Sequence, residues 1–306
     1  METVIKIDHL TKDFGHGRGV FDVSFDVSKG ECFGYLGPNG AGKSTTIRML
    51  MGFTHPGSGG AYIHGGEVLK DRANIMQGVA YVPGEIALPP NLTGYDVLKI
   101  QRELKGVGDD SEMKRLIELF QLDASLRCKE MSLGMRRKLV IVGAFLSRPD
   151  VIILDEPSSG LDPEMQEVFV SLIQEKKKQG KTILLSSHIF SEVDRLADRI
   201  AIIKDGKIVS FFKADDLKHK SLKTYLLTFA SEHDKKGFVG VSHRFLKIVD
   251  PNASPNAALI AFEDKDVNIA LKEIARERLL DFSERKETLE DYFMSFYKEE
   301  RTYERL

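Results

Sequence analysis

The chain has 306 residues, which is long enough for one large and one small domain. Its hydrophobic fraction of 42% and charged fraction of 29% are ordinary for a globular protein and exclude a disordered one. The formal net charge of -2 provides no overall field that would select nucleic acid as a partner. Cys32 and Cys128 are far apart and form no metal-spaced pair, which indicates a reducing compartment.

Apolar segments are too short for a membrane span. The longest runs, such as Leu139 to Leu146, fall well below the roughly 20 apolar residues that cross a bilayer. The first ten residues lack the apolar core of a signal peptide. We therefore expect a cytoplasmic protein that reaches a membrane only through a partner chain.

The beginning of the chain predicts strands followed by a loop and a helix. Apolar and polar residues alternate in the first two segments, as in half-exposed strands, and the third segment is a short apolar run. A glycine-rich loop and a helical run follow. The predicted elements are strands at Thr3–Leu10, Val20–Val27 and Cys32–Leu36 and a helix at Ser44–Met51.

From about residue 92 the pattern becomes helical. Thr93 can cap a helix that runs to Leu104, and Ser111 opens a second helix with apolar residues at the 3.6-residue period. Residues 85–148 are thus expected to form a helical insert in an α/β domain that spans residues 1–215. After the insert, strands are predicted at Val151–Leu154, Thr182–Ser186, Ile200–Lys204 and Lys207–Phe211, and helices at Glu164–Gln179 and Phe190–Leu196.

A second, α+β accessory domain is expected over residues 216–306, where the pattern starts afresh. Its strand–helix order resembles the split β-α-β, ferredoxin-like arrangement. Strands are predicted at Thr224–Phe229, Phe245–Val249, Ala258–Phe262 and Leu279–Phe282, with a short helix after the first, a helix at Val267–Glu277 and a last helix containing Leu289, Phe293 and Phe296. The expected core residues are Leu226, Phe245, Ile260, Ile269, Leu279 and Phe293. An apolar stripe left exposed on the last helix would mark an interface.

The most specific motif is the glycine-rich loop between a predicted strand and a predicted helix. It fits G-x-x-x-x-G-K-[ST], in which backbone N–H groups and a helix N-terminus bind phosphate. Lys43 would place its charge on the β and γ phosphates of ATP, and the Ser44 hydroxyl would bind Mg²⁺. The expected nucleotide-binding residues are Gly37, Pro38, Asn39, Gly40, Ala41, Gly42, Lys43, Ser44 and Thr45.

Two carboxylates end the apolar strand that begins at Val151. A strand this apolar is typical of the centre of a parallel sheet, so its last residues emerge at the carboxyl edge, where ligands bind. Asp155 is expected in the Mg²⁺ shell, and Glu156 is expected to act as general base on the attacking water.

A third motif narrows the choice of protein family. Met131-Ser-Leu-Gly-Met135 opens a helix just upstream of the acidic strand. By itself it could be a serine-capped helix, but in this order the three motifs resemble the ABC ATPases over about residues 1–212. In that family this serine and glycine contact the γ-phosphate of ATP held by the opposing subunit, and the resemblance assigns that role to Ser132 and Gly134.

Further matches to the ABC ATPases follow in chain order. The segment Leu10–Gly15 resembles the one that stacks an aromatic ring on adenine, which would be Phe14; the alternative is a core aromatic. Ser159-Gly-Leu-Asp162 is similar to the loop that communicates across the dimer, and Asp162 is assigned to the nucleotide site. His188 matches the histidine that contacts the γ-phosphate.

Three positions depart from the family pattern. Leu133 and Met135 stand where glycine and glutamine are common, and Gly84 stands where a glutamine usually touches Mg²⁺ or water. Glu85 is the residue that could substitute for this glutamine.

The motif set favours a transporter ATPase over two other classes. A non-transport ABC ATPase, acting in regulation, translation or DNA repair, is the main alternative, but this chain has one cassette and no long coiled coil. A P-loop kinase would not need all these motifs. The resemblance implies ATP and Mg²⁺, a second copy and a membrane permease as partners, and a position at the cytoplasmic face of the membrane. The tail Glu287–Phe293 resembles ATPases of bacterial exporters.

Overall fold

The computed structural model describes residues 2–218, 222–285, 289–290 and 293. The chain divides into two compact units, Met1–Ala214 and Asp215–Leu306. Within the described residues no helix is long and apolar enough to cross a bilayer.

The first unit is built on a six-stranded sheet in the order β10-β9-β3-β8-β7-β6. Every neighbouring pair is parallel except the hairpin β9–β10. Three central strands are buried along their whole length, as expected for a sheet covered on both faces. The strands are β3 (Cys32–Leu36), β6 (Val79–Val82), β7 (Val151–Asp155), β8 (Thr182–Ser187), β9 (Arg199–Lys204) and β10 (Lys207–Lys213).

The two faces of this sheet support two separate cores. On β7, Ile152 and Leu154 pack into one core, whereas Val151 and Ile153 pack into the other. The second core is closed by helix α1 (Lys43–Leu50) and by an antiparallel sheet in the order β2-β1-β4-β5. This sheet consists of β1 (Thr3–Asp13), β2 (Gly19–Ser28), β4 (Ser58–Ile63) and β5 (Gly66–Glu67), and helix α2 (Val68–Ile75) follows it.

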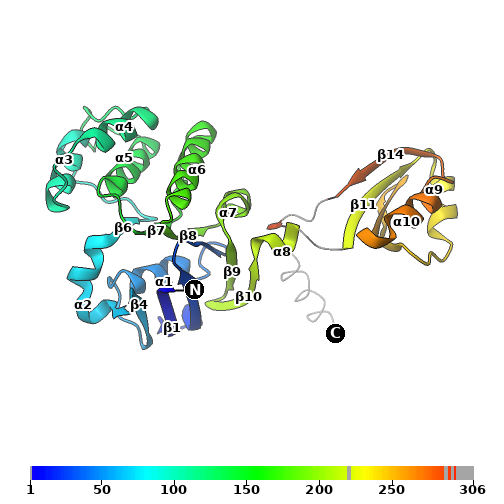
Figure 1. The fold of residues 1–306 in the computed structure, drawn as a ribbon, viewed down its shortest axis with the longest axis horizontal. Helices are drawn as coiled ribbons and strands as arrows, with labels where there is room; N and C mark the ends of the chain where they lie inside the picture. Colours follow the sequence, from blue (N-terminus) through cyan, green and yellow to red (C-terminus); the bar gives the residue numbers. More distant parts are fainter. Residues whose placement is uncertain (1, 219–221, 286–288, 291–292, 294–306) are drawn as a thin grey trace. The chain divides into compact units, whose positions relative to one another are not determined.

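The first core is closed by the helical insert and by helix α6 (Pro163–Lys178). Figure 1 shows α3 (Gly94–Leu104), α4 (Ser111–Leu119) and α5 (Leu133–Phe145) gathered at one end of this unit, beside α6. Thr93 caps α3 in a capping box with Asp96, which confirms the predicted helix start. Helix α7 (Phe190–Leu196) packs on the sheet near β3 and β8.

The second unit is a four-stranded antiparallel sheet in the order β12-β13-β11-β14. Each helix joins two strands that have one strand between them, which is the predicted split β-α-β order. The elements are β11 (Leu222–Phe229), α9 (Glu232–Val239), β12 (Lys247–Ser254), β13 (Ala257–Glu263), α10 (Val267–Ile274) and β14 (Leu279–Glu284); helix α8 (Ala214–Lys218) precedes them.

Several expectations for the second unit were wrong in detail. Leu227 and Phe229 are buried on β11, whereas Leu226 is half-buried, because alternate side chains of a strand face opposite sides of the sheet. Helix α10 ends at Ile274, and Ile269 on it is exposed rather than in the core. Phe293, by contrast, is buried as expected of a core residue, and Leu289 is buried as well, so these two positions form no exposed stripe. Phe296 lies outside the described residues.

Candidate nucleotide site

The phosphate loop runs from the end of β3 to the start of α1. Gly42 has φ 110°, and a Cβ there would lie 2.5 Å from Val20 Cγ1, so the turn has no room for a side chain. The turn brings the Lys43 side chain back under its own loop. Lys43 Nζ donates to the Gly37 carbonyl at 2.7 Å and to the Pro38 carbonyl at 3.1 Å.

Lys43, Glu156 and His188 form a chain of charged and polar contacts. Lys43 is 3% exposed, and its Nζ lies 3.1 Å from Glu156 Oε1. Glu156 Oε2 lies 3.1 Å from His188 Nδ1. Glu156 has φ 47°, a left-handed conformation that a residue with a side chain seldom adopts, at the point where the chain leaves β7. The predicted base, phosphate clamp and histidine therefore meet around one carboxylate.

Asp155 is the buried last residue of β7, and two hydroxyls donate to it. Ser44 Oγ lies 3.0 Å and Ser186 Oγ 2.7 Å from Asp155 Oδ1. Ser186 pairs with Asp155 in the parallel register of β7 and β8. A carboxylate beside a serine hydroxyl is the all-oxygen donor set that Mg²⁺ prefers, so the residues present fit this ion.

Lys43, Ser44, Asp155 and Glu156 line a cavity of about 350 Å³ at the phosphate loop, whereas Ser186 and His188 are outside its lining. The lining is strongly polar and holds one lysine, one arginine and three carboxylates, together with the backbone at the N-terminus of α1. The lining residues are Asn39, Gly40, Gly42, Lys43, Ser44, Thr45, Arg48, Gly84, Glu85, Asp155 and Glu156.

Several residues assigned to the nucleotide lie outside this cavity lining. Phe14 follows the end of β1 and is 56% exposed, so the alternative of a core aromatic is wrong. Ser132 accepts the Met135 N–H at 3.2 Å and caps α5, with Gly134 in its first turn. Asp162 caps α6 in the same way. Ser132 and Asp162 are exposed, which leaves them accessible to another molecule.

The Gly84 position faces Asp155. A Cβ at Gly84 would lie 3.1 Å from Asp155 Oδ2, so a side chain there would reach the predicted metal site. The Glu85 side chain is 88% exposed, and its carboxylate forms an ion pair with Arg48 at 2.9 Å.

Sequence reasoning missed Ser186, Arg48 and Arg137. Ser186 had a signal, because two serines end the apolar strand beside the acidic one. Arg48 lies one turn after Ser44 on α1, and this spacing places both side chains on one helix face. The contacts of Arg137 had no local signal, because its partners are Pro83, Gly84 and Ser159.

Known proteins have sequences related to this chain. The family model described as "ABC transporter" matches residues 20–159. The chain is 33% identical over 306 residues to the bacitracin transport ATP-binding protein of Bacillus licheniformis, covering 96% of this chain and 97% of the relative. It is 30% identical over 303 residues to a Nod factor export ATP-binding protein of Rhizobium etli, covering 95% and 92%.

A solved structure has the same cassette. The ATP-binding subunit of an ABC transporter superimposes with a TM-score of 0.64 at 31% identity, over 70% of this chain and 92% of that one. This coverage matches the length of the first unit, and the relatives above extend through the second. Sequence, fold and a phosphate loop facing an acidic strand end therefore place this chain in the ABC transporter family, as an ATP-binding subunit that hydrolyses ATP for transport.

Proposed function

We propose that this chain powers export through a separate membrane permease, at the cytoplasmic face of the membrane. Two copies would close head to tail on ATP, each nucleotide lying between the phosphate loop of one copy and Ser132 and Gly134 of the other. The observation that carries this proposal is the position of Ser132. It caps the start of α5, it is exposed, and it does not line the nucleotide cavity of its own copy, so it is accessible to the nucleotide of another copy. Export is supported by the Nod factor relative, which is an export protein by name.

The roles within the site follow from its contacts. Lys43 would exchange its contact with Glu156 for the β and γ phosphates, because their oxygens carry more negative charge than one carboxylate. Ser44 and Asp155 would hold Mg²⁺, which neutralises phosphate charge when bound. Phe14 would stack on adenine, Asp162 would act at the dimer contact, and His188 would contact the γ-phosphate.

Glu156 would act as general base once Lys43 binds phosphate. The attacking water gives a proton to the Glu156 carboxylate while the oxygen of this water bonds to the γ-phosphorus. The bond between that phosphorus and the bridging oxygen breaks, and ADP and inorganic phosphate form. His188, 3.1 Å from Glu156, would keep the carboxylate oriented.

We also propose that the chain consists of two domains with different roles. Residues 1–215 would form the ATPase domain, with residues 85–148 as its helical subdomain, and residues 216–306 an accessory domain. The compact units Met1–Ala214 and Asp215–Leu306 support this boundary.

Replacement of the base tests the proposal. Glu156→Gln keeps the side-chain size but cannot accept the proton, so ATP turnover should fall by roughly 10²- to 10⁴-fold while ATP binding persists. With ATP, the variant should elute as a dimer in size-exclusion chromatography. Glu118→Gln, on the exposed surface of α4, is the matched control and should behave as the parent. Turnover of Glu156→Gln within about threefold of this control would remove Glu156 from the role.

A further inference from the structure

Arg137, in the second turn of α5, is buried and binds two loops of the nucleotide site. It is 3% exposed. Its Nη1 donates to the Pro83 carbonyl at 2.6 Å, and its Nη2 donates to the Gly84 carbonyl at 2.8 Å. Its Nε donates to the Ser159 carbonyl at 3.0 Å. One guanidinium thus connects the helix that begins after Ser132 with two loops distant in sequence.

Both loops adjoin the two acidic residues that follow one another at the end of β7. The Gly84 loop follows β6, and the Gly84 Cα faces Asp155 so closely that a Cβ would be 3.1 Å from Asp155 Oδ2. The Ser159 N–H donates to the Glu156 carbonyl at 3.2 Å. A shift of either loop would therefore move the backbone or the surroundings of Asp155 and Glu156.

The electrostatics favour a positioning role over a purely stabilising one. Burial lowers the pKa of Arg137, and the charges of Asp155 and Glu156 oppose this effect. An arginine remains charged in this setting, and its rigid planar fork donates in fixed directions to three separate carbonyls, a geometry that the compact ammonium of lysine and the amide of glutamine do not reproduce. A buried cation is a costly way to stabilise a fold, because apolar residues of similar volume often do so better.

We propose that Arg137 is a positioning residue that couples the start of α5 to the two catalytic carboxylates. When Ser132 binds the ATP of the other copy, α5 moves with it, and Arg137 carries this movement to the Gly84 and Ser159 loops. The inference rests on the proposed function, because it needs Ser132 to act across a dimer. Gly84 has no side chain that could couple its loop to α5, and Arg137 provides this coupling through its hydrogen bond to the Gly84 carbonyl.

The test compares two adjacent arginines. Arg136 is the matched control, because it donates to the Cys128 and Lys129 carbonyls within the helical insert and not to the site loops. We would measure kcat, KM, equilibrium ATP binding and thermal melting for Arg137→Gln and Arg136→Gln. Arg137→Gln should lose about 10- to 100-fold in kcat, as expected for misplaced catalytic groups. Its ATP affinity should stay within about threefold of the parent, and Arg136→Gln should retain both parameters.

Arg137→Lys provides a second measurement. Lysine keeps the charge but lacks the planar fork, so the kcat of Arg137→Lys should lie between those of Arg137→Gln and the parent. If Arg137→Gln does not fold, Arg137→Lys decides alone: a kcat equal to that of the parent would overturn the proposal. It would also be overturned if kcat and ATP binding of Arg137→Gln fell together, or if its kcat matched that of Arg136→Gln. If Glu156→Gln loses turnover as predicted but Arg137→Gln keeps the kcat of the parent, only the inference about Arg137 is wrong. If Glu156→Gln keeps the kcat of the parent, the proposed function is wrong.

Discussion

At the scale of single residues, the charged groups of the site contact one another. Lys43 is surrounded by two loop carbonyls and the Glu156 carboxylate, and Glu156 also contacts His188. In the proposed mechanism the phosphates of ATP take over the contact with Lys43, which would free the Glu156 carboxylate to contact the attacking water.

A second buried carboxyl supports the histidine segment. Glu192 on α7 is buried, and Ser187 Oγ donates to its Oε2 at 2.6 Å. The same Ser187 oxygen accepts the Ile189 N–H at 2.9 Å, so the backbone on both sides of His188 is held. Burial raises the pKa of Glu192 above its ordinary value of 4.5, and hydrogen bonds from Ser187 and Ser158 partly oppose this shift.

This raised pKa predicts a pH dependence of stability. A carboxyl whose folded pKa exceeds its unfolded pKa binds the proton more tightly when folded. Its stabilising effect is complete below the unfolded pKa of about 4.5 and is lost as the pH rises through the folded pKa. Glu192→Gln remains neutral, so its melting temperature relative to the parent should increase with pH from about 5 to 8. A melting-temperature difference that is constant or shrinks over this range would contradict the expectation.

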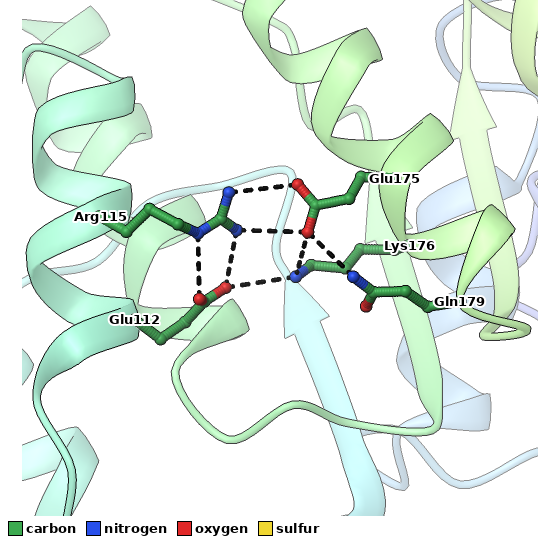
Figure 2. A network of polar contacts seen from close by, with 5 residues as sticks. All are labelled: Glu112, Arg115, Glu175, Lys176 and Gln179. Carbon is green, nitrogen blue, oxygen red and sulfur yellow. Dashed lines mark hydrogen bonds and ion pairs between the residues drawn. The ribbon is translucent and has the colours of Figure 1, made fainter.

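At the scale of elements, a polar network connects the helical insert to the core of the cassette. Figure 2 shows Arg115 and Glu112 of α4 facing Glu175 and Lys176 of α6, with Gln179 beyond them. Lys176 Nζ lies 3.2 Å from both Glu112 Oε1 and Glu175 Oε1. The Arg115 side chain is 42% exposed, so solvent weakens its ion pairs. The Lys176 side chain is only 7% exposed, so its ion pairs are less weakened.

Removal of the buried lysine should loosen the insert. Lys176→Met leaves two carboxylates with Arg115 as their remaining cation in the network of Figure 2, and the free energy of unfolding should fall by about 1–3 kcal/mol. Lys178→Met, at an exposed position near the end of α6, should change it by less than about 0.5 kcal/mol. Urea unfolding followed by circular dichroism measures both values. Equal stability of the two variants would show that the network does not brace the insert.

At the scale of the whole molecule, the nucleotide cavity is lined by residues of the first unit among those that the structure describes. Every residue that lines the cavity precedes Ala214. The second unit has its own core around Leu227, Phe229 and Ile260. It is therefore a compact α+β unit with an apolar core of its own.

A chain shortened to residues 1–215 tests this separation. It should bind ATP within about threefold of the full chain, because no cavity residue is removed. Dimer formation in the Glu156→Gln background, or copurification with the permease, should weaken. Loss of ATP binding by a shortened chain that remains folded would show that the second unit contributes to the site.

The sequence by itself determined the phosphate loop, the acidic strand and the order of the strands and helices. These features depend on neighbours in the chain. Gly42 must turn without a side chain, Asp155 must end a buried strand, and Thr93 must cap the helix that follows it. Local chemistry at a fixed spacing is sufficient to place such residues.

The tertiary structure alone decided which distant residues meet and which apolar side chains are buried. Ser186 reaches Asp155 only because β7 and β8 pair in parallel, and Arg137 reaches Gly84 across 53 positions of the chain. Phe14 and Ile269 are as apolar as many core residues, yet both are exposed. Burial and long-range polar contacts depend on which elements pack together, and no short stretch of sequence contains that information.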